Sequence, residues 1–432
     1  MARIHFIDVT NRDGVQTSRI KLSKFQKTMV NWYLSKIGVF QSEFGFPFSD
    51  HEYHYLQGNL ALKANGAFGT MVLEGWVRAL RSDVERAVAV GCTDLNLSMS
   101  TSDLMLQLKF RGKLDRAAVT REMTDAVQAA KEGGVRTIGV NAEDASRTDI
   151  AQLIEFALAA KEAGAVRFRY CDTLGFDSPR TIYDRITRLA EAVGIPIEPH
   201  CHDDLGMANA NSVFAAQAAV DAGVDAYINA TVNGNGERAG QADLLSCILA
   251  ITYANGLQGY ELGEQLDLSW AWKLGNYVAR SYGLPVPIRQ VGIGANAFAH
   301  ESGIHADGAL KDRHNYELYD YELLGRPELE ETPTGRVITT GEYGGLAGFK
   351  YVYGQLGITF ADNAQAADVL ELVQVANGHN QKPLLPDELR FIAAHPDEVR
   401  TILTTSPWRS QARHPAQRAP GGSAQQAAAG GA

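Results

Sequence analysis

The sequence predicts an α/β protein: a (β/α)8 TIM barrel followed by a smaller, mainly helical C-terminal region. Three observations predict the barrel. Short β-rich runs alternate with longer helical stretches up to about residue 255, and this alternation is typical of parallel sheets. Eight such runs occur in about 250 residues, the usual length of a closed barrel. Several helical stretches also end at glycine, as helix C-termini commonly do.

The predicted strands can be placed in chain order. They are residues 4–10, 40–47, 70–77, 93–100, 136–144, 166–173, 196–204 and 225–234. After residue 265 the alternation stops; a helical stretch is followed by an irregular one rich in His, Gly and Tyr. We therefore expect a barrel domain over residues 1–265 and C-terminal subdomains over residues 266–404. Residues 405–432 have low complexity and are expected to be disordered.

Composition narrows the class of protein. The 432 residues are 45% hydrophobic and carry a net charge of −10, which argues against general nucleic-acid binding. No apolar run approaches the roughly 18 residues of a membrane span, and the N-terminus lacks the apolar segment of a signal peptide. The four cysteines form no CxxC pair, which favours a reducing, cytoplasmic location.

Polar residues stand at the end of nearly every predicted strand. In a barrel of this kind the active site lies at the C-terminal strand ends, so these residues predict one shared site. They are Arg12, Asp13, Glu43, Arg78, Ser98, Ser100, Glu143, Asp144, Asp172, Thr173, His200, His202 and Asn233.

The HCHDD stretch at residues 200–204 indicates a metal site. Residues two apart on a strand face the same side, so His200 and His202 can reach one ion. Asp13 is the best candidate for a carboxylate ligand from another strand, and such a set suits a catalytic divalent metal with open positions. The NGNGERAG loop at 233–240 lacks the GxGxxG spacing of a dinucleotide site and fits an anionic ligand better.

Four motifs in order resemble the 2-isopropylmalate and homocitrate synthase family of metal-dependent barrel enzymes. They are FIDVTNRDGVQ, HCHDDLGMANAN, TVNGNGERAG and AHESGIHADGALKDRHNYE, within residues 4–325. The chain is most similar to the homocitrate synthases of nitrogenase-cofactor synthesis and to phosphonomethylmalate synthases of phosphonate-antibiotic pathways. The resemblance implies an acyltransferase that condenses acetyl-CoA with a 2-oxo acid and releases CoA.

The resemblance also implies residue roles. Asp13, His200 and His202 would bind a divalent ion (Mg, Mn, Co or Zn), with Asn233 as a further ligand. Arg12 would bind substrate and stabilise the developing alkoxide, and Thr173 would bind the acceptor carboxylate. Glu143, His305 and Tyr316 would form the acid/base group. The last two lie beyond the predicted barrel, and the resemblance implies a domain-swapped homodimer in which they reach the partner's site.

The acceptor stays open at this point. It is expected to carry a second anionic group, which Arg78 could bind, and 3-phosphonopyruvate, 2-oxoglutarate and oxaloacetate all qualify. Gly139 stands where lysine-pathway homocitrate synthases carry an arginine, and TTGEYGG at 339–345 departs from the family pattern. The alternatives are a metal-dependent carbon–carbon lyase of the same superfamily and a 2-isopropylmalate or citramalate synthase.

Overall fold

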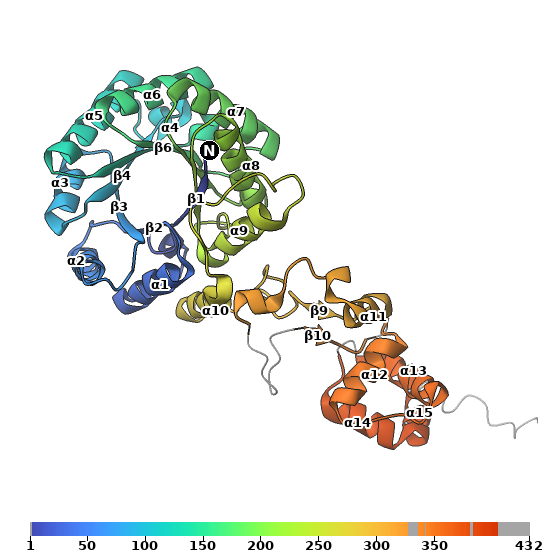
Figure 1. Cartoon of the computed structure of the whole chain (residues 1–432). Coiled ribbons are helices and arrows are strands. Elements are labelled where there is room, and N and C mark those ends of the chain that lie inside the picture. The colour runs from blue at the N-terminus through green and yellow to red at the C-terminus, as the bar shows by residue number, and fades with distance from the viewer. Residues whose placement is uncertain (1, 327–335, 342, 381–382, 405–432) are drawn as a thin grey trace, which may run out of the picture. The chain divides into compact units, whose positions relative to one another are not determined.

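The computed structural model describes residues 2–326, 336–341, 343–380 and 383–404. Eight parallel strands form a closed barrel in chain order, and β8 pairs with β1 through Ile4–Ala226 to Asp8–Ala230 (Figure 1). The predicted barrel is confirmed. Its strands are β1 (Ile4–Asp8), β2 (Gln41–Gly45), β3 (Val72–Arg78), β4 (Asp94–Ser100), β5 (Thr137–Glu143), β6 (Arg167–Asp172), β7 (Ile197–Cys201) and β8 (Ala226–Ala230).

Helices surround the barrel as an outer layer (Figure 1). Their ends follow local chemistry: at α1, Ser23 and Gln26 form a reciprocal capping box, and Gly38 ends the helix with φ 88°. The helices are α1 (Lys24–Ile37), α2 (Asp50–Ala64), α3 (Arg81–Val90), α4 (Asp103–Leu108), α5 (Arg116–Glu132), α6 (Ile150–Ala163), α7 (Pro179–Val193), α8 (Ala208–Asp221) and α9 (Leu244–Tyr253).

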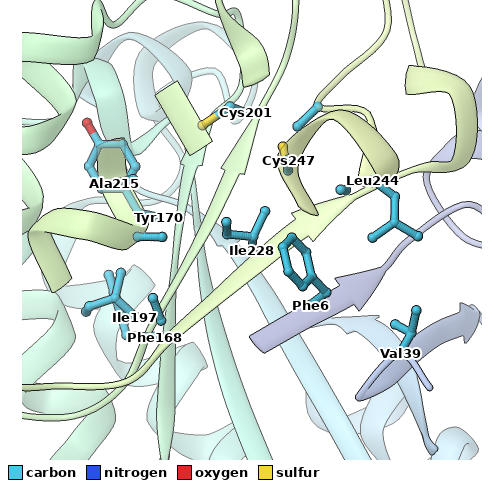
Figure 2. Packing of buried hydrophobic residues seen from close by; sticks show 14 of the residues in the cluster. Phe6, Val39, Phe168, Tyr170, Ile197, Cys201, Ala215, Ile228, Leu244 and Cys247 are labelled. Atoms are coloured by element: carbon cyan, nitrogen blue, oxygen red, sulfur yellow. The ribbon is translucent and has the colours of Figure 1, made fainter. Parts of the chain in front are cut away.

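The hydrophobic core lies between the strands and this helical layer. Phe6 of β1 and Ile228 of β8 occupy paired positions and are buried side by side, with Leu244 and Cys247 of α9 nearby (Figure 2). Alternate residues on the same strands point into the barrel instead. The outward-pointing apolar residues thus pack the helices against the sheet. The inward-pointing positions can carry polar and charged side chains.

The inside of the barrel holds a network of buried charges. Arg167 binds Glu74 at 2.7 Å and Glu198 at 2.9 Å. Arg169, which is fully buried, binds Glu198 at 2.8 Å and Glu43 at 2.6 Å. Buried charges are tolerated when they are paired in this way. Through Arg169 the network reaches Glu43 of β2.

The described residues divide into two compact units, one within residues 1–298 and 317–336 and the other within residues 299–316 and 337–432. The first unit extends past the boundary expected at residue 265, because α10 (Ala271–Tyr282) packs on α1 and the Trp270 ring lies 5.6 Å from that of Trp32. The expected disordered tail at 405–432 lies outside the described residues.

The second unit is mainly helical, as predicted. Its elements are a two-stranded parallel sheet of β9 (Ala299–His300) and β10 (Val337–Ile338), with α11 (Gly303–Lys311), α12 (Leu346–Gln355), α13 (Asn363–Asn380), α14 (Pro386–Ala394) and α15 (Pro396–Thr404). Among the described residues of both units, no helix has the length and apolar character needed to cross a membrane.

Candidate active site

A tight turn after β1 presents two of the predicted site residues. The backbone N–H groups of Arg12, Asp13 and Gly14 all donate to the carbonyl of Val9, at 2.9–3.2 Å. The Asn11 amide fixes the turn to α1, donating to the Lys27 carbonyl and to Asn31 Oδ1, each at 2.8 Å. Arg12 and Asp13 are therefore held at the mouth of the barrel by backbone geometry.

The three predicted metal ligands lie together. His200 Nε2 is 3.1 Å and His202 Nε2 is 3.8 Å from Asp13 Oδ2, and the ligand atoms all lie within 4.8 Å of one another. Gln241, which the sequence did not single out, donates from Nε2 to Asp13 Oδ2 at 3.1 Å. All three side chains are buried, so an ion held here would be shielded from bulk water on the protein side.

The electrostatics of the cluster fit a divalent cation. Burial alone would raise the pKa of Asp13, but Arg12, His200 and His202 lower that pKa well below its usual value. Burial and the neighbouring His200 lower the pKa of His202 to about 4, so this imidazole is neutral and has a lone pair at pH 7. Buried His200 Nδ1 and His202 Nδ1 have no hydrogen-bond partner among the described residues. One carboxylate and two imidazoles form a donor set for a catalytic metal.

Arg12 links this cluster to the charges inside the barrel. Its guanidinium binds Asp13 at 3.2 Å, forms a short hydrogen bond to Glu43 and lies 4.9 Å from the centre of the Trp76 ring. Burial would lower the pKa of Arg12, but Asp13 and Glu43 raise it above its usual value. The guanidinium therefore stays charged and can meet a developing oxyanion.

Glu143 ends β5 on the opposite side of the mouth, bonded to Ser100. Lys109, which follows α4 and was not predicted, donates from Nζ to Glu143 Oε2 at 2.5 Å and to Ser100 Oγ at 3.0 Å. Thr173 lies at the end of β6, where its hydroxyl accepts a hydrogen bond from the Asp144 N–H at 2.9 Å.

Two cavities open beside these residues and share Trp76 and Arg78. The larger, about 800 Å³, is lined by Arg12, Gln16, Lys21 and the rings of Phe46, Phe48 and Trp76. The smaller, about 330 Å³, is lined by Ser98, Ser100, Lys109 and Glu143. Both volumes lie in the range of small-molecule sites. Arg78 is 60% exposed and holds Asp83 through two hydrogen bonds of 2.6 and 2.9 Å.

Asn233 does not point toward the three metal ligands Asp13, His200 and His202. Its backbone is left-handed (φ 61°), and its side-chain Nδ2 donates to the Gly275 carbonyl of α10 at 2.9 Å. Its role as a metal ligand stays a prediction. The motif alone could not determine this orientation, because it depends on a helix beyond the barrel.

His305 and Tyr316 belong to the second unit. His305 is exposed on α11, and its ring centre lies 4.4 Å from that of Tyr316, which is 42% exposed. The two residues therefore form a pair of their own within that unit. The sequence does not predict the contact between these two rings. The contact forms because the chain turns back after α11 ends at Lys311.

Comparisons with known proteins cover most of the chain. Residues 3–278 match the HMGL-like family, and residues 293–380 match the Homocitrate synthase post-HMGL domain-like family. Citrate (Re)-synthase of Dehalococcoides mccartyi (strain CBDB1) is 52% identical over 411 residues, 94% of this chain and 99% of that protein.

More distant relatives also match over most of both chains. 2-Isopropylmalate synthase 2 of Caldanaerobacter subterraneus subsp. tengcongensis is 37% identical, over 90% of this chain and 94% of its own. Homocitrate synthase 1 of Nostoc sp. is 33% identical, over 90% and 96%. Among solved structures, the HMG-CoA lyase of Pseudomonas aeruginosa superposes with a TM-score of 0.54 at 17% identity, over 66% of this chain and 94% of that one. That likeness shows a common fold.

Proposed function

The chain belongs to the HMGL-like family, and on that premise we propose that it condenses acetyl-CoA with oxaloacetate to give citrate and free CoA. The observation that carries the proposal is the 52% identity to a protein named Citrate (Re)-synthase, over nearly the full length of both chains. Relatives named 2-isopropylmalate and homocitrate synthase stand lower, at 37% and 33%. Oxaloacetate carries the second anionic group that was expected of the acceptor, and the name of this relative favours it over 2-oxoglutarate and 3-phosphonopyruvate.

The proposed reaction balances as a condensation followed by hydrolysis. A base removes a proton from the acetyl-CoA methyl group, and the resulting carbanion attacks C2 of oxaloacetate. The alkoxide that forms at C2 takes up a proton, and water cleaves the thioester to citrate and CoA. A thioester α-proton is weakly acidic, so a positioned base and a stabilised oxyanion are both required.

The residues at the mouth suit these steps. Asp13, His200 and His202 would hold a divalent metal, which supplies Lewis-acid polarisation of the acceptor carbonyl. Arg12 stays charged beside the triad and would stabilise the alkoxide. Thr173 would bind the acceptor carboxylate, and Glu143 with His305 and Tyr316 would move the protons. The larger cavity, with aromatic walls and cationic Lys21, suits the apolar arm and phosphates of acetyl-CoA.

The proposal is tested by free-thiol release from acetyl-CoA with purified protein and Mn²⁺ or Mg²⁺. The acceptors are oxaloacetate, 2-oxoglutarate, 3-phosphonopyruvate, pyruvate and 2-oxoisovalerate, and the product is identified by mass spectrometry. We expect the highest kcat/KM with oxaloacetate and citrate as its product. A higher kcat/KM with another acceptor would assign the chain to that substrate instead. Cleavage of citrate with no condensation would favour the lyase alternative.

A further inference from the structure

We propose that Lys109 binds the distal carboxylate of the acceptor and so selects dicarboxylic over monocarboxylic 2-oxo acids. This inference rests on the proposed function and adds a specificity residue to it. It concerns the smaller cavity, whose lining includes the ends of β4 and β5. The roles proposed for the metal ligands and Thr173 account for the 2-oxo and carboxylate groups of the acceptor. They assign no partner to its second negative charge.

The position of Lys109 is fixed at both ends of α4. Ser102 caps the start of this six-residue helix and bonds the Asp144 carboxylate, and Lys109 at its other end bonds Glu143. The helix is thus tied to the end of β5 by neighbouring carboxylates. The ammonium group cannot leave the mouth without breaking these bonds.

Polar side chains of β4, β5 and β6 form a row at the mouth of the barrel. Asn141 Nδ2 donates to Ser98 Oγ at 3.0 Å, and Cys171 Sγ lies 2.6 Å from Asn141 Oδ1. Cys171 is the register partner of His200 on β7. The row begins at Ser98, which lines the smaller cavity together with Lys109, and it ends on the strand next to His200. The proposal places the acceptor along this row, with its 2-oxo end at the metal ligands and its distal carboxylate at Lys109.

Three other cations that line the two cavities, Arg12, Arg78 and Lys27, already hold carboxylates. Arg12 binds Asp13 and Glu43, and Arg78 directs two N–H groups at Asp83. Lys27 donates to both oxygens of Glu52. Lys109 makes two hydrogen bonds and has a third N–H to offer, with its side chain 49% exposed.

Strand β5 itself supplies no cation to this row. Gly139 occupies the inward position two residues before Asn141, and a Cβ placed there would lie 2.6 Å from Asn96 Nδ2. A longer side chain at Gly139 would have to displace Asn96. Lys109, which lines the same cavity, is the cation that the proposal assigns to this role.

The test compares ligands that differ only by the distal carboxylate. Malate and lactate are stable analogues of oxaloacetate and pyruvate, and their binding to the Mn²⁺-loaded protein is measured by calorimetry. The variants are Lys109→Met, Lys109→Arg and the control Lys113→Met, an exposed lysine on the same segment that does not line the cavity. We expect Lys109→Met to reduce the preference for malate over lactate by ~10–100-fold, the usual effect of losing a charge-assisted hydrogen bond. Lys109→Arg should retain most of the preference, and Lys113→Met all of it.

Steady-state kinetics distinguish binding of the acceptor by Lys109 from a role in which Lys109 only positions Glu143. If Lys109 selects the acceptor, Lys109→Met raises KM for oxaloacetate and leaves KM for pyruvate unchanged. An equal fall in kcat with both acceptors, with unchanged KM and an unchanged malate preference, would overturn the proposal. If the wild-type protein releases no CoA with oxaloacetate, the proposed function fails, and the malate-to-lactate ratio still decides the role of Lys109.

Discussion

Asp13 illustrates how single residues are held at the barrel mouth. Its carboxylate faces Arg12 on one side and two imidazoles on the other, and Gln241 donates to the same oxygen as the histidines. Within the described part of the chain, this cluster consists of Asp13 and the two imidazoles of His200 and His202. Removing one imidazole therefore leaves the buried carboxylate of Asp13 with fewer partners. The site should therefore fail as a unit rather than by degrees.

His200→Ala is predicted to lose metal and activity together. Two protein ligands would remain, and the Lewis-acid contribution of several kcal/mol would go with the ion, a loss of at least ~10³-fold in kcat. Metal content by mass spectrometry and CoA release are measured on the same preparation. His54→Ala, an exposed histidine on α2, serves as the control. Full activity of exhaustively chelated wild-type protein would refute the metal assignment.

Glu74 gives the stability a predictable pH dependence. Burial raises the pKa of Glu74 to about 8, with Glu198 adding to the shift and Arg167 and Arg169 opposing it. A carboxyl group whose folded pKa is raised contributes stability below its unfolded pKa, near 4.5, and loses it as the pH rises through the folded value.

The wild-type Tm should therefore fall between pH 5 and pH 9 by more than that of Glu74→Gln, which mimics the protonated side chain. Circular dichroism melts of both proteins across this range check the prediction. A constant offset between the two Tm curves at every pH would show that Glu74 does not titrate here.

At the scale of elements, the sequence predicts where the strands lie. It does not predict which polar side chains form ion pairs with one another. Alternation along the chain located all eight strands, and the strand ends located Asp13, Glu143, His200 and His202. The ion pairs of Arg167 and Arg169 join β6 to strands far away in sequence, so no local pattern reveals them. Lys109 was missed because it follows a short helix, α4, and its contact with Glu143 joins residues 34 positions apart in the sequence.

Replacing a glycine by alanine should have opposite effects on stability in helix α2 and in strand β3. Gly58 is exposed in α2 and a Cβ there would meet no atom within 4 Å, so Gly58→Ala should stabilise the protein by ~0.5–1 kcal/mol. In Gly75→Ala of β3, the new methyl group would meet Leu95 at 3.0 Å and Cys92 at 3.2 Å, and the cost should be ~1–3 kcal/mol. Urea unfolding of both variants provides the comparison. Destabilisation by the Gly58 change would contradict this account.

At the scale of the whole molecule, the domain-swapped homodimer remains a prediction. His305 is exposed on α11 beside Ile304, which is 75% exposed, and both belong to the unit that does not contain the triad. Exposed apolar surface of this kind suits burial in an interface.

Mixing inactive Asp13→Ala and His305→Ala subunits tests the arrangement. In a swapped heterodimer one of the two sites regains both residues, so the mixture should recover up to about a quarter of wild-type activity if subunits exchange at random. Native mass spectrometry verifies the exchange. Exchange without recovered activity would assign His305 to the site of its own chain.

The second unit is assembled from two stretches of chain, and the segment between them returns to the barrel. In that returning segment Leu324 is fully buried, and Arg326 donates to the carbonyls of Gly292 and Gly294 at 2.8 and 3.0 Å. In genetic terms, the units are not modules that one recombination crossover could exchange between relatives. A stop codon after residue 298 would also remove part of the barrel unit, so gene fusions and chimeras must cross over on both sides of residues 317–326.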